Sequence, residues 1–144
     1  MPRLDAERIG LWRQLCQSSA ALQRKVDAQL TEEHFLSLVW FECLAAIRDA
    51  GGVMRVHELS EVLGELPSSL SRRLDRLEDE GYVRRKHTPL PDDRRAVSVS
   101  LTAAGRNAWR DANITYRRMV QAHFAQHLTD TDIAALQRIF GKLA

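Results

Sequence analysis

The sequence contains few cysteines and no long hydrophobic run. Its two cysteines, Cys16 and Cys43, are far apart and form no Cys-x-x-Cys pair, so we expect neither a disulfide nor a cysteine-based zinc site. No stretch of about 18 or more apolar residues is present, which argues against a membrane-spanning helix. The first residues, MPRLDAERIGLW, lack the apolar segment and cleavage site of a secretory signal. These absences predict a cytoplasmic protein without a membrane partner.

The sequence also lacks the patterns that accompany catalysis. It has no glycine-rich phosphate loop, no nucleophile and base at a recognisable spacing, and no paired carboxylates of the kind found in a catalytic cleft. We therefore expect no catalytic residue, no cofactor and no enzymatic activity.

Charge is distributed unevenly along the chain. At 144 residues and 44% hydrophobic content the sequence fits a single globular domain, and its formal net charge is only +2. That total hides a basic cluster between residues 72 and 95, interleaved with acidic residues, which is typical of a patterned binding surface rather than a basic tail. The cluster comprises Arg72, Arg73, Arg76, Arg84, Arg85, Lys86, Arg94 and Arg95.

Hydrophobic periodicity and capping residues predict a mainly helical chain with a small β-hairpin. The second helix, which includes FLSLVWFECLAAI, is apolar almost all round and should be buried on most sides. Thr129 and Asp132 have the spacing of a capping box. The predicted elements are a helix over residues 4–29, a helix capped by Thr31 and ending at Gly51-Gly52, a short strand over 53–56, a helix ending at Gly64, a helix from Pro67 to Gly81, two hairpin strands around the loop TPLPDD, a helix from Thr102 to about His127, and a final helix after Thr129.

The helix that begins at Pro67 has two chemically different faces. At 100° per residue, Leu70, Leu74 and Leu77 share the side that packs inward, and Arg73 lies nearer the edge of the core. Small hydroxyls permit close approach to a DNA groove, and arginine can bond guanine in bidentate fashion. An ordinary solvated helix is the alternative. The outward side carries Ser68, Ser69, Arg72 and Arg76.

The hairpin extends this basic surface. Arg84 and Arg85 lie on its first strand, and Arg94 and Arg95 lie at its tip, where an arginine can enter a minor groove. We expect a neighbouring carboxylate, Asp92 or Asp93, to hold an arginine guanidinium in one pose. On the second strand Val97, Val99 and Leu101 share the face that should pack on the core.

These motifs together resemble the MarR family of bacterial transcriptional regulators. The resemblance is carried by VHELSEVLGELPSSLSRRLDRLEDEGYVRR followed by DDRRAVSVSLTAAG, within residues 53–105, and the flanking helices match in length and apolar pattern. It implies a winged helix-turn-helix, mainly α with a small β-hairpin wing (α+β), in a homodimer that represses transcription from a pseudo-palindromic operator in double-stranded DNA. Residues 1–144 would form one domain, with dimerisation helices at about 1–30 and 102–144, the winged core at about 31–101 and the wing at about 82–101. The implied DNA-binding residues are Ser68, Ser69, Arg72, Arg76, Arg84, Arg85, Asp93, Arg94 and Arg95. The first four would face the major groove, Arg94 or Arg95 would enter the minor groove, and Asp93 would orient the wing.

The sequence departs from the family pattern at two points. Leu66 stands where a capping serine is frequent, and the wing loop is about two residues longer than usual. The fold alone does not fix function, so a winged-helix module that binds protein and not DNA is the alternative. The serines and arginines of the exposed helix face favour DNA, because a protein-docking face more often shows apolar anchors.

The resemblance also implies a small aromatic or anionic effector bound between the dimer helices and the winged core. The residues expected to approach such a cleft are Trp12, Cys16, His34, Leu38 and Trp40. Cys16 stands where a peroxide-sensing relative has its reactive thiol, but Leu30 and Phe41 occupy the positions of the supporting tyrosines, so a buried structural cysteine is favoured over a sensor.

Two further groups of residues could have a functional role, as metal ligands or as the lining of a pocket, but a structural role is favoured for both. Glu33-His34 resembles a pair used by zinc-responsive relatives, but the matching histidines early in the fifth helix are absent. His123 and His127 are one turn apart and could bind metal, but interface packing is favoured for them, so no metal site is predicted. The apolar residues of the last helices are most simply assigned to the dimer core rather than to a pocket: Trp109, Met119, Val120, Phe124 and Leu128.

Overall fold

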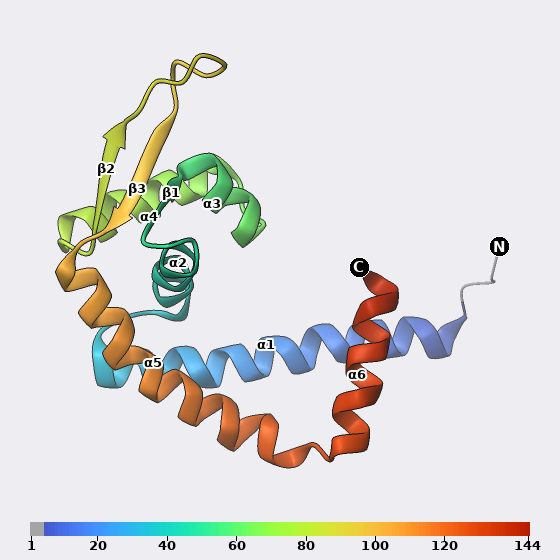
Figure 1. Cartoon of the computed structure of the whole chain (residues 1–144). Helices are drawn as coiled ribbons and strands as arrows, with labels where there is room; N and C mark the ends of the chain where they lie inside the picture. The colour runs from blue at the N-terminus through green and yellow to red at the C-terminus, as the bar shows by residue number, and fades with distance from the viewer. Residues whose placement is uncertain (1–4) are drawn as a thin grey trace.

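The fold consists of six α-helices and a three-stranded sheet, in a computed structural model that describes residues 5–144 (Figure 1). The predicted class, mainly helical with a small hairpin, is confirmed. Within the described residues no helix is long and apolar enough to cross a bilayer. The elements are α1 (Ala6–His34), α2 (Leu38–Asp49), β1 (Val53–Arg55), α3 (Val56–Leu63), α4 (Pro67–Asp79), β2 (Val83–His87), β3 (Val97–Leu101), α5 (Ala103–His123), a 3-10 turn (Ala125–His127) and α6 (Asp130–Leu143).

The boundary between the first two helices differs from the prediction. Thr31 does not cap a second helix, since α1 continues to His34 and buries Leu30 completely. Phe35 ends α1 in the left-handed conformation (φ 53°), with its amide donating to the Thr31 carbonyl at 3.0 Å. Ser37 then caps α2 by accepting a hydrogen bond from the Trp40 amide at 3.3 Å. The predicted first residue of α1, Leu4, lies outside the described residues.

The sheet joins the hairpin to a strand that precedes α3. Its order is β1-β3-β2, and both pairings are antiparallel, with Met54 opposite Val99 in one and Arg85 opposite Val99 in the other. Val99 and Leu101 are buried whereas Ser98 and Ser100 remain partly exposed, as the alternation of side chains along a strand predicts. The central strand therefore belongs to the hairpin, and β1 fixes that hairpin to the helices.

The core lies between α2, α4 and the sheet. Leu70, Leu74 and Leu77 of α4 are fully buried, and this confirms the inward face that their spacing predicts. From α2, Phe41 and Ile47 are buried in the same cluster, but Val39 remains 48% exposed, so this helix is not buried on all sides.

The helix α5 begins where the sheet ends. Thr102 caps it by accepting from the Gly105 amide at 3.0 Å, as predicted, and also donates its hydroxyl to the Gly81 carbonyl at 2.5 Å. Gly105 is buried, and a Cβ placed there would lie 2.0 Å from the Tyr82 carbonyl oxygen. This close approach requires glycine, and it joins α5 to the winged part of the molecule, which comprises α2–α4 and the sheet.

The helix α5 ends four residues earlier than predicted, at His123, because Phe124 leaves helical geometry (φ −130°, ψ −68°). The predicted capping box at Thr129 and Asp132 is present at the start of α6. No residue of α6 is buried, and Figure 1 shows this helix turning back from the end of α5 and crossing α1. The long helices α1, α5 and α6 thus form an arm, with α2–α4 and the sheet above it.

Candidate nucleic-acid interface

The outward face of α4 has the composition predicted from the sequence. Ser68, Ser69, Arg72 and Arg76 are all exposed, on the side of the helix opposite its buried leucines. Within residues 5–144 neither arginine forms an ion pair. Both guanidinium groups can therefore meet an external acceptor such as a base edge or a phosphate.

The start of α4 offers further hydrogen-bond donors. Pro67 occupies the first turn, and the capping residue, Leu66, makes no side-chain hydrogen bond to the helix. The first-turn amides, those of Ser68 and Ser69 included, therefore lack the side-chain acceptor that a serine cap would provide. Such amides at a helix N-terminus favour a phosphate.

Arg73 has a different role from its neighbours on α4. Its Nη1 lies 2.8 Å from both carboxylate oxygens of Glu65 and 3.6 Å from the sulfur of Cys43. Burial raises the pKa of the Cys43 thiol, and Arg73 opposes that shift only in part. Arg73 thus connects α4 to α2, as its predicted place near the core suggests, and does not join the exposed face.

The two basic residues of β2 also have different roles. Arg84 is exposed, but Arg85 pairs with two carboxylates of α4, those of Asp75 and Glu78. Burial tends to lower the pKa of Arg85, yet the hydrogen bonds to these carboxylates raise it overall. Arg85 therefore holds the wing against α4, a role that its assignment as a DNA contact did not include, because its partners lie seven and ten residues away.

The tip of the wing is held through its backbone. Asp93 accepts the Arg95 amide at 3.0 Å, and its other carboxylate oxygen lies 3.4 Å from Nη2 of Arg55. The His87 ring contacts the Arg94 carbonyl at 2.8 Å. The prediction that an aspartate holds the guanidinium of Arg94 or Arg95 is therefore wrong in this structure: Asp93 orders the loop, and both guanidinium groups remain exposed. Asp92, also exposed, forms no ion pair within residues 5–144.

The expected effector residues do not gather around one cleft. Of the five, only Leu38 lines the large cleft between the arm and the winged part. Trp12 is 65% exposed, and Cys16 is exposed rather than buried as expected. Trp40 packs instead against the hydrophobic core.

His34 belongs to a polar network at the junction of α1 and α5. Its Nε2 lies 2.7 Å from the hydroxyl of Thr115, which donates to Glu33 at 2.6 Å. Arg118 donates to the same carboxylate at 2.7 Å. The hydrogen bonds from Thr115, Gln29 and Arg118, in that order, lower the pKa of Glu33 to about 2. The network fixes α5 on α1 and engages His34, which does not line the cleft.

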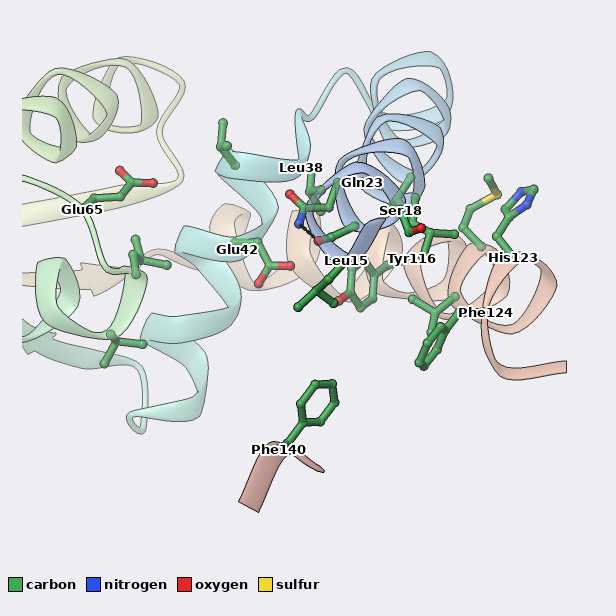
Figure 2. A pocket seen from close by; sticks show the side chains of 18 of the residues that line it. Leu15, Ser18, Gln23, Leu38, Glu42, Glu65, Tyr116, His123, Phe124 and Phe140 are labelled. Carbon is green, nitrogen blue, oxygen red and sulfur yellow. Dashed lines mark hydrogen bonds between the residues drawn. The ribbon is translucent and has the colours of Figure 1, made fainter. Parts of the chain in front are cut away.

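The cleft itself has a volume of about 710 Å³ and is lined mostly by apolar side chains (Figure 2). Met119, Val120 and Phe124, which were expected in a dimer core, line it, whereas Trp109 packs under Arg48, whose guanidinium lies 4.0 Å from the ring centre. Helical periodicity identified these apolar positions but could not assign them, since the walls come from several helices. The lining residues are Leu15, Ser18, Ser19, Leu22, Gln23, Val26, Leu38, Val39, Glu42, Val62, Leu63, Glu65, Arg73, Tyr116, Met119, Val120, His123, Phe124, Leu136 and Phe140.

Among residues 5–144, no three histidine, cysteine or acidic side chains come together as a metal site would require. Glu33 and His34 are engaged by Thr115, and the His127 ring contacts the Ala122 carbonyl at 3.0 Å.

Known proteins with similar sequences and structures are regulators of transcription. The MarR family model matches residues 36–97. The chain is 34% identical to the HTH-type transcriptional regulator PecS of Dickeya dadantii over 72% of its own length and 62% of that of PecS, which is just under two thirds. It is 32% identical to the multiple antibiotic resistance protein MarR of Escherichia coli, over 72% of this chain and 69% of MarR.

Two solved structures with bound DNA resemble the whole fold. A point mutant of E. coli MarR complexed with operator DNA has a TM-score of 0.81 and 28% identity, with 99% of each chain covered. Sco3205 of Streptomyces coelicolor in complex with DNA has a TM-score of 0.87 and 26% identity, covering 99% of this chain and 89% of that one. The exposed arginines of α4, the wing beside them and these likenesses agree: this chain belongs to the MarR family of DNA-binding transcriptional regulators.

Proposed function

We propose that this protein acts as a homodimeric repressor that binds a pseudo-palindromic operator, with α4 in the major groove and the wing tip in the minor groove. The observation that carries the proposal is the pair of exposed arginines, Arg72 and Arg76, which form no ion pair within residues 5–144 and lie behind two serines on one face of α4. Repression is supported by the relative MdtR of Bacillus subtilis, a transcriptional repressor that is 29% identical over 70% of this chain. The proposed DNA contacts are Ser68, Ser69, Arg72, Arg76, Arg84, Arg94 and Arg95, while Arg85 and Asp93 position the wing.

The shapes of α4 and of the wing tip suit them to different DNA grooves. The α4 arginines can read base edges in the major groove, whereas Arg94 and Arg95, on a narrow loop, suit the negative potential of a minor groove. Arg85 and Asp93 then set the angle between α4 and the wing tip, because Arg85 joins β2 to α4 and Asp93 joins the wing loop to Arg55.

Apolar surface on the arm supports dimerisation. Of the 29 residues of α1 only Val26 and Leu30 are buried, and α6 buries none. Large apolar side chains left this exposed within one chain are typical of a surface that a second copy covers. The proposed interface includes Leu11, Trp12, Ile114, Ile133, Ile139 and Leu143.

The cleft is the proposed effector site. Its walls include Tyr116 and Met119 of the arm and Val62 and Leu63 of α3, so a bound molecule would contact both parts of the chain. A ligand that binds one relative placement of these parts more tightly shifts the population toward it. In the dimer, such a shift would change the spacing of the two α4 helices and weaken operator binding.

The test is fluorescence anisotropy with DNA from upstream of the protein's own gene, titrated with the wild type and with Arg72→Ala and Arg76→Ala. Each variant should lose about 1–3 kcal/mol of specific binding and show relaxed base preference. Arg24→Ala on α1 removes the same charge from the arm and should bind like the wild type. Wild-type affinity in both α4 variants would refute the assignment, and a monomer by light scattering at micromolar concentration would refute the dimer.

A further inference from the structure

The carboxylate and guanidinium groups that line the cleft are not balanced, and the imidazole of His123, which also lines it, forms no ion pair with either carboxylate within residues 5–144. Four of its lining residues carry carboxylate, guanidinium or imidazole groups: Glu42, Glu65, Arg73 and His123. Arg73 and Glu65 neutralise each other at 2.8 Å, and Arg73 also contacts Cys43. The guanidinium of Arg73 is therefore already engaged and is poorly placed to receive a ligand carboxylate.

Glu42 is the acidic group that this pairing leaves over. Within residues 5–144 it forms no salt bridge. Its polar contact is the hydroxyl of Tyr116, whose ring is stacked on Phe41 with centroids 4.5 Å apart. Burial raises the pKa of Glu42, and the hydrogen bond from Tyr116 opposes this shift. Its carboxylate is thus partly desolvated without a cationic partner.

The surroundings of Glu42 are apolar and aromatic. Figure 2 shows its carboxylate pointing toward Leu15 and Tyr116, with Phe124 and Phe140 on other walls of the same cleft. A carboxylate in such surroundings gains more from a cation than it would in water, because the local dielectric constant is lower.

We propose that the cleft binds an organic cation, an ammonium group carried on an aromatic or aliphatic body, with the ammonium group at Glu42 and the body against the apolar walls. This rests on the proposed function, in which the cleft is the effector site. Of the aromatic or anionic effectors that the family resemblance implies, it keeps the aromatic body and excludes the anionic group. An anion would face Glu42, while the nearest guanidinium is already occupied by Glu65.

The experiment compares three probes with the same body and different head groups. Isothermal titration of the full-length protein uses 4-phenylbutylamine, 4-phenylbutanol and 4-phenylbutanoate. The amine should bind about tenfold more tightly than the alcohol, which is the order expected for a charged hydrogen bond, and the carboxylate should bind weakest. Equal or tighter binding of the alcohol or carboxylate, or no binding of any probe, would overturn the proposal.

Two variants connect the preference to one side chain. Glu42→Gln keeps the shape and should weaken the amine about tenfold while leaving the alcohol unchanged. Glu32→Gln removes an exposed carboxylate of α1 that does not line the cleft and should change neither. An amine preference that survives in Glu42→Gln would overturn the assignment; should that variant fold poorly by circular dichroism, the wild-type probe series decides alone.

Operator binding is measured on the same preparations. A wild type that binds operator DNA but not the amine contradicts only the cation inference. A wild type that binds the amine but no operator contradicts only the proposed function, so the two failures are distinguishable.

Discussion

Replacing Gly105 by alanine tests how closely the arm is joined to the winged part. A Cβ at this position would lie 2.0 Å from the Tyr82 carbonyl oxygen and 2.9 Å from its carbon. Both atoms belong to the backbone, so no change of rotamer can relieve the contact. The first turn of α5 must therefore move away from Tyr82, the residue before β2, by about an ångström or more to restore ordinary van der Waals separation.

That displacement strains the hydrogen bonds around Thr102. Its amide donates to the Tyr82 carbonyl at 3.1 Å, and its hydroxyl donates to the Gly81 carbonyl while accepting the Gly105 amide. Overpacking of this kind costs about 1–3 kcal/mol, and loss of a helix cap costs about 1 kcal/mol more. Alanine recovers about 1 kcal/mol of helix propensity, so the net expected loss is about 1–3 kcal/mol.

The assay is urea unfolding followed by circular dichroism at one fixed protein concentration. Gly10→Ala is the matched control: this glycine lies within α1 with nothing within 4 Å of its added Cβ, so the variant should keep or gain up to about 1 kcal/mol. If Gly105→Ala unfolds at the same urea concentration as the wild type, the close approach of α5 to β2 is not as described.

Three further measurements address the wing, the α1–α5 junction and the cysteines. The double variant Arg94→Ala/Arg95→Ala should weaken operator binding and reduce the slope of log affinity against log salt by about 2, and an unchanged slope would exclude both side chains from phosphate contact. The side-chain carboxyl of Glu33 should titrate near pH 2 by NMR rather than near 4.5. The stability that its ionised form provides is therefore present above pH 4.5 and is lost as the pH falls toward 2. A titration midpoint near 4.5 would contradict the hydrogen-bond network. In the native protein a thiol reagent that acts in water should modify the exposed Cys16 far faster than the buried Cys43, and equal rates would contradict their placement.

Sequence periodicity predicted the helix α4 and its two faces correctly. The leucines of α4 and the caps at Thr102 and Thr129 depend on neighbours within a few residues, and the structure confirms each of them. The end of α1 was predicted wrongly for a related reason. Thr31 has the local chemistry of a cap, but burial of Leu30 favours continuation of the helix past it.

Polar pairings were the least accessible to sequence reasoning. Arg85 was grouped with the DNA contacts because its charge matches theirs, yet its position on β2 brings it to Asp75 and Glu78 of α4. His34 was expected in the cleft but bonds Thr115, 81 residues further along the chain. A guanidinium or imidazole group has the same chemistry in either role, and only its neighbours in space decide which role it takes.

By itself, then, the sequence determined which segments are helical, which face of α4 is buried and where the basic charge is concentrated, because these follow from the spacing of residues a few positions apart. The tertiary structure decided the rest: which arginines remain exposed, how Asp93 orders the wing, and which side chains surround the cleft. Those outcomes depend on contacts between segments far apart in the chain. The environment of Glu42 was decided in the same way: the guanidinium that lines the same cleft, that of Arg73, is already paired with Glu65.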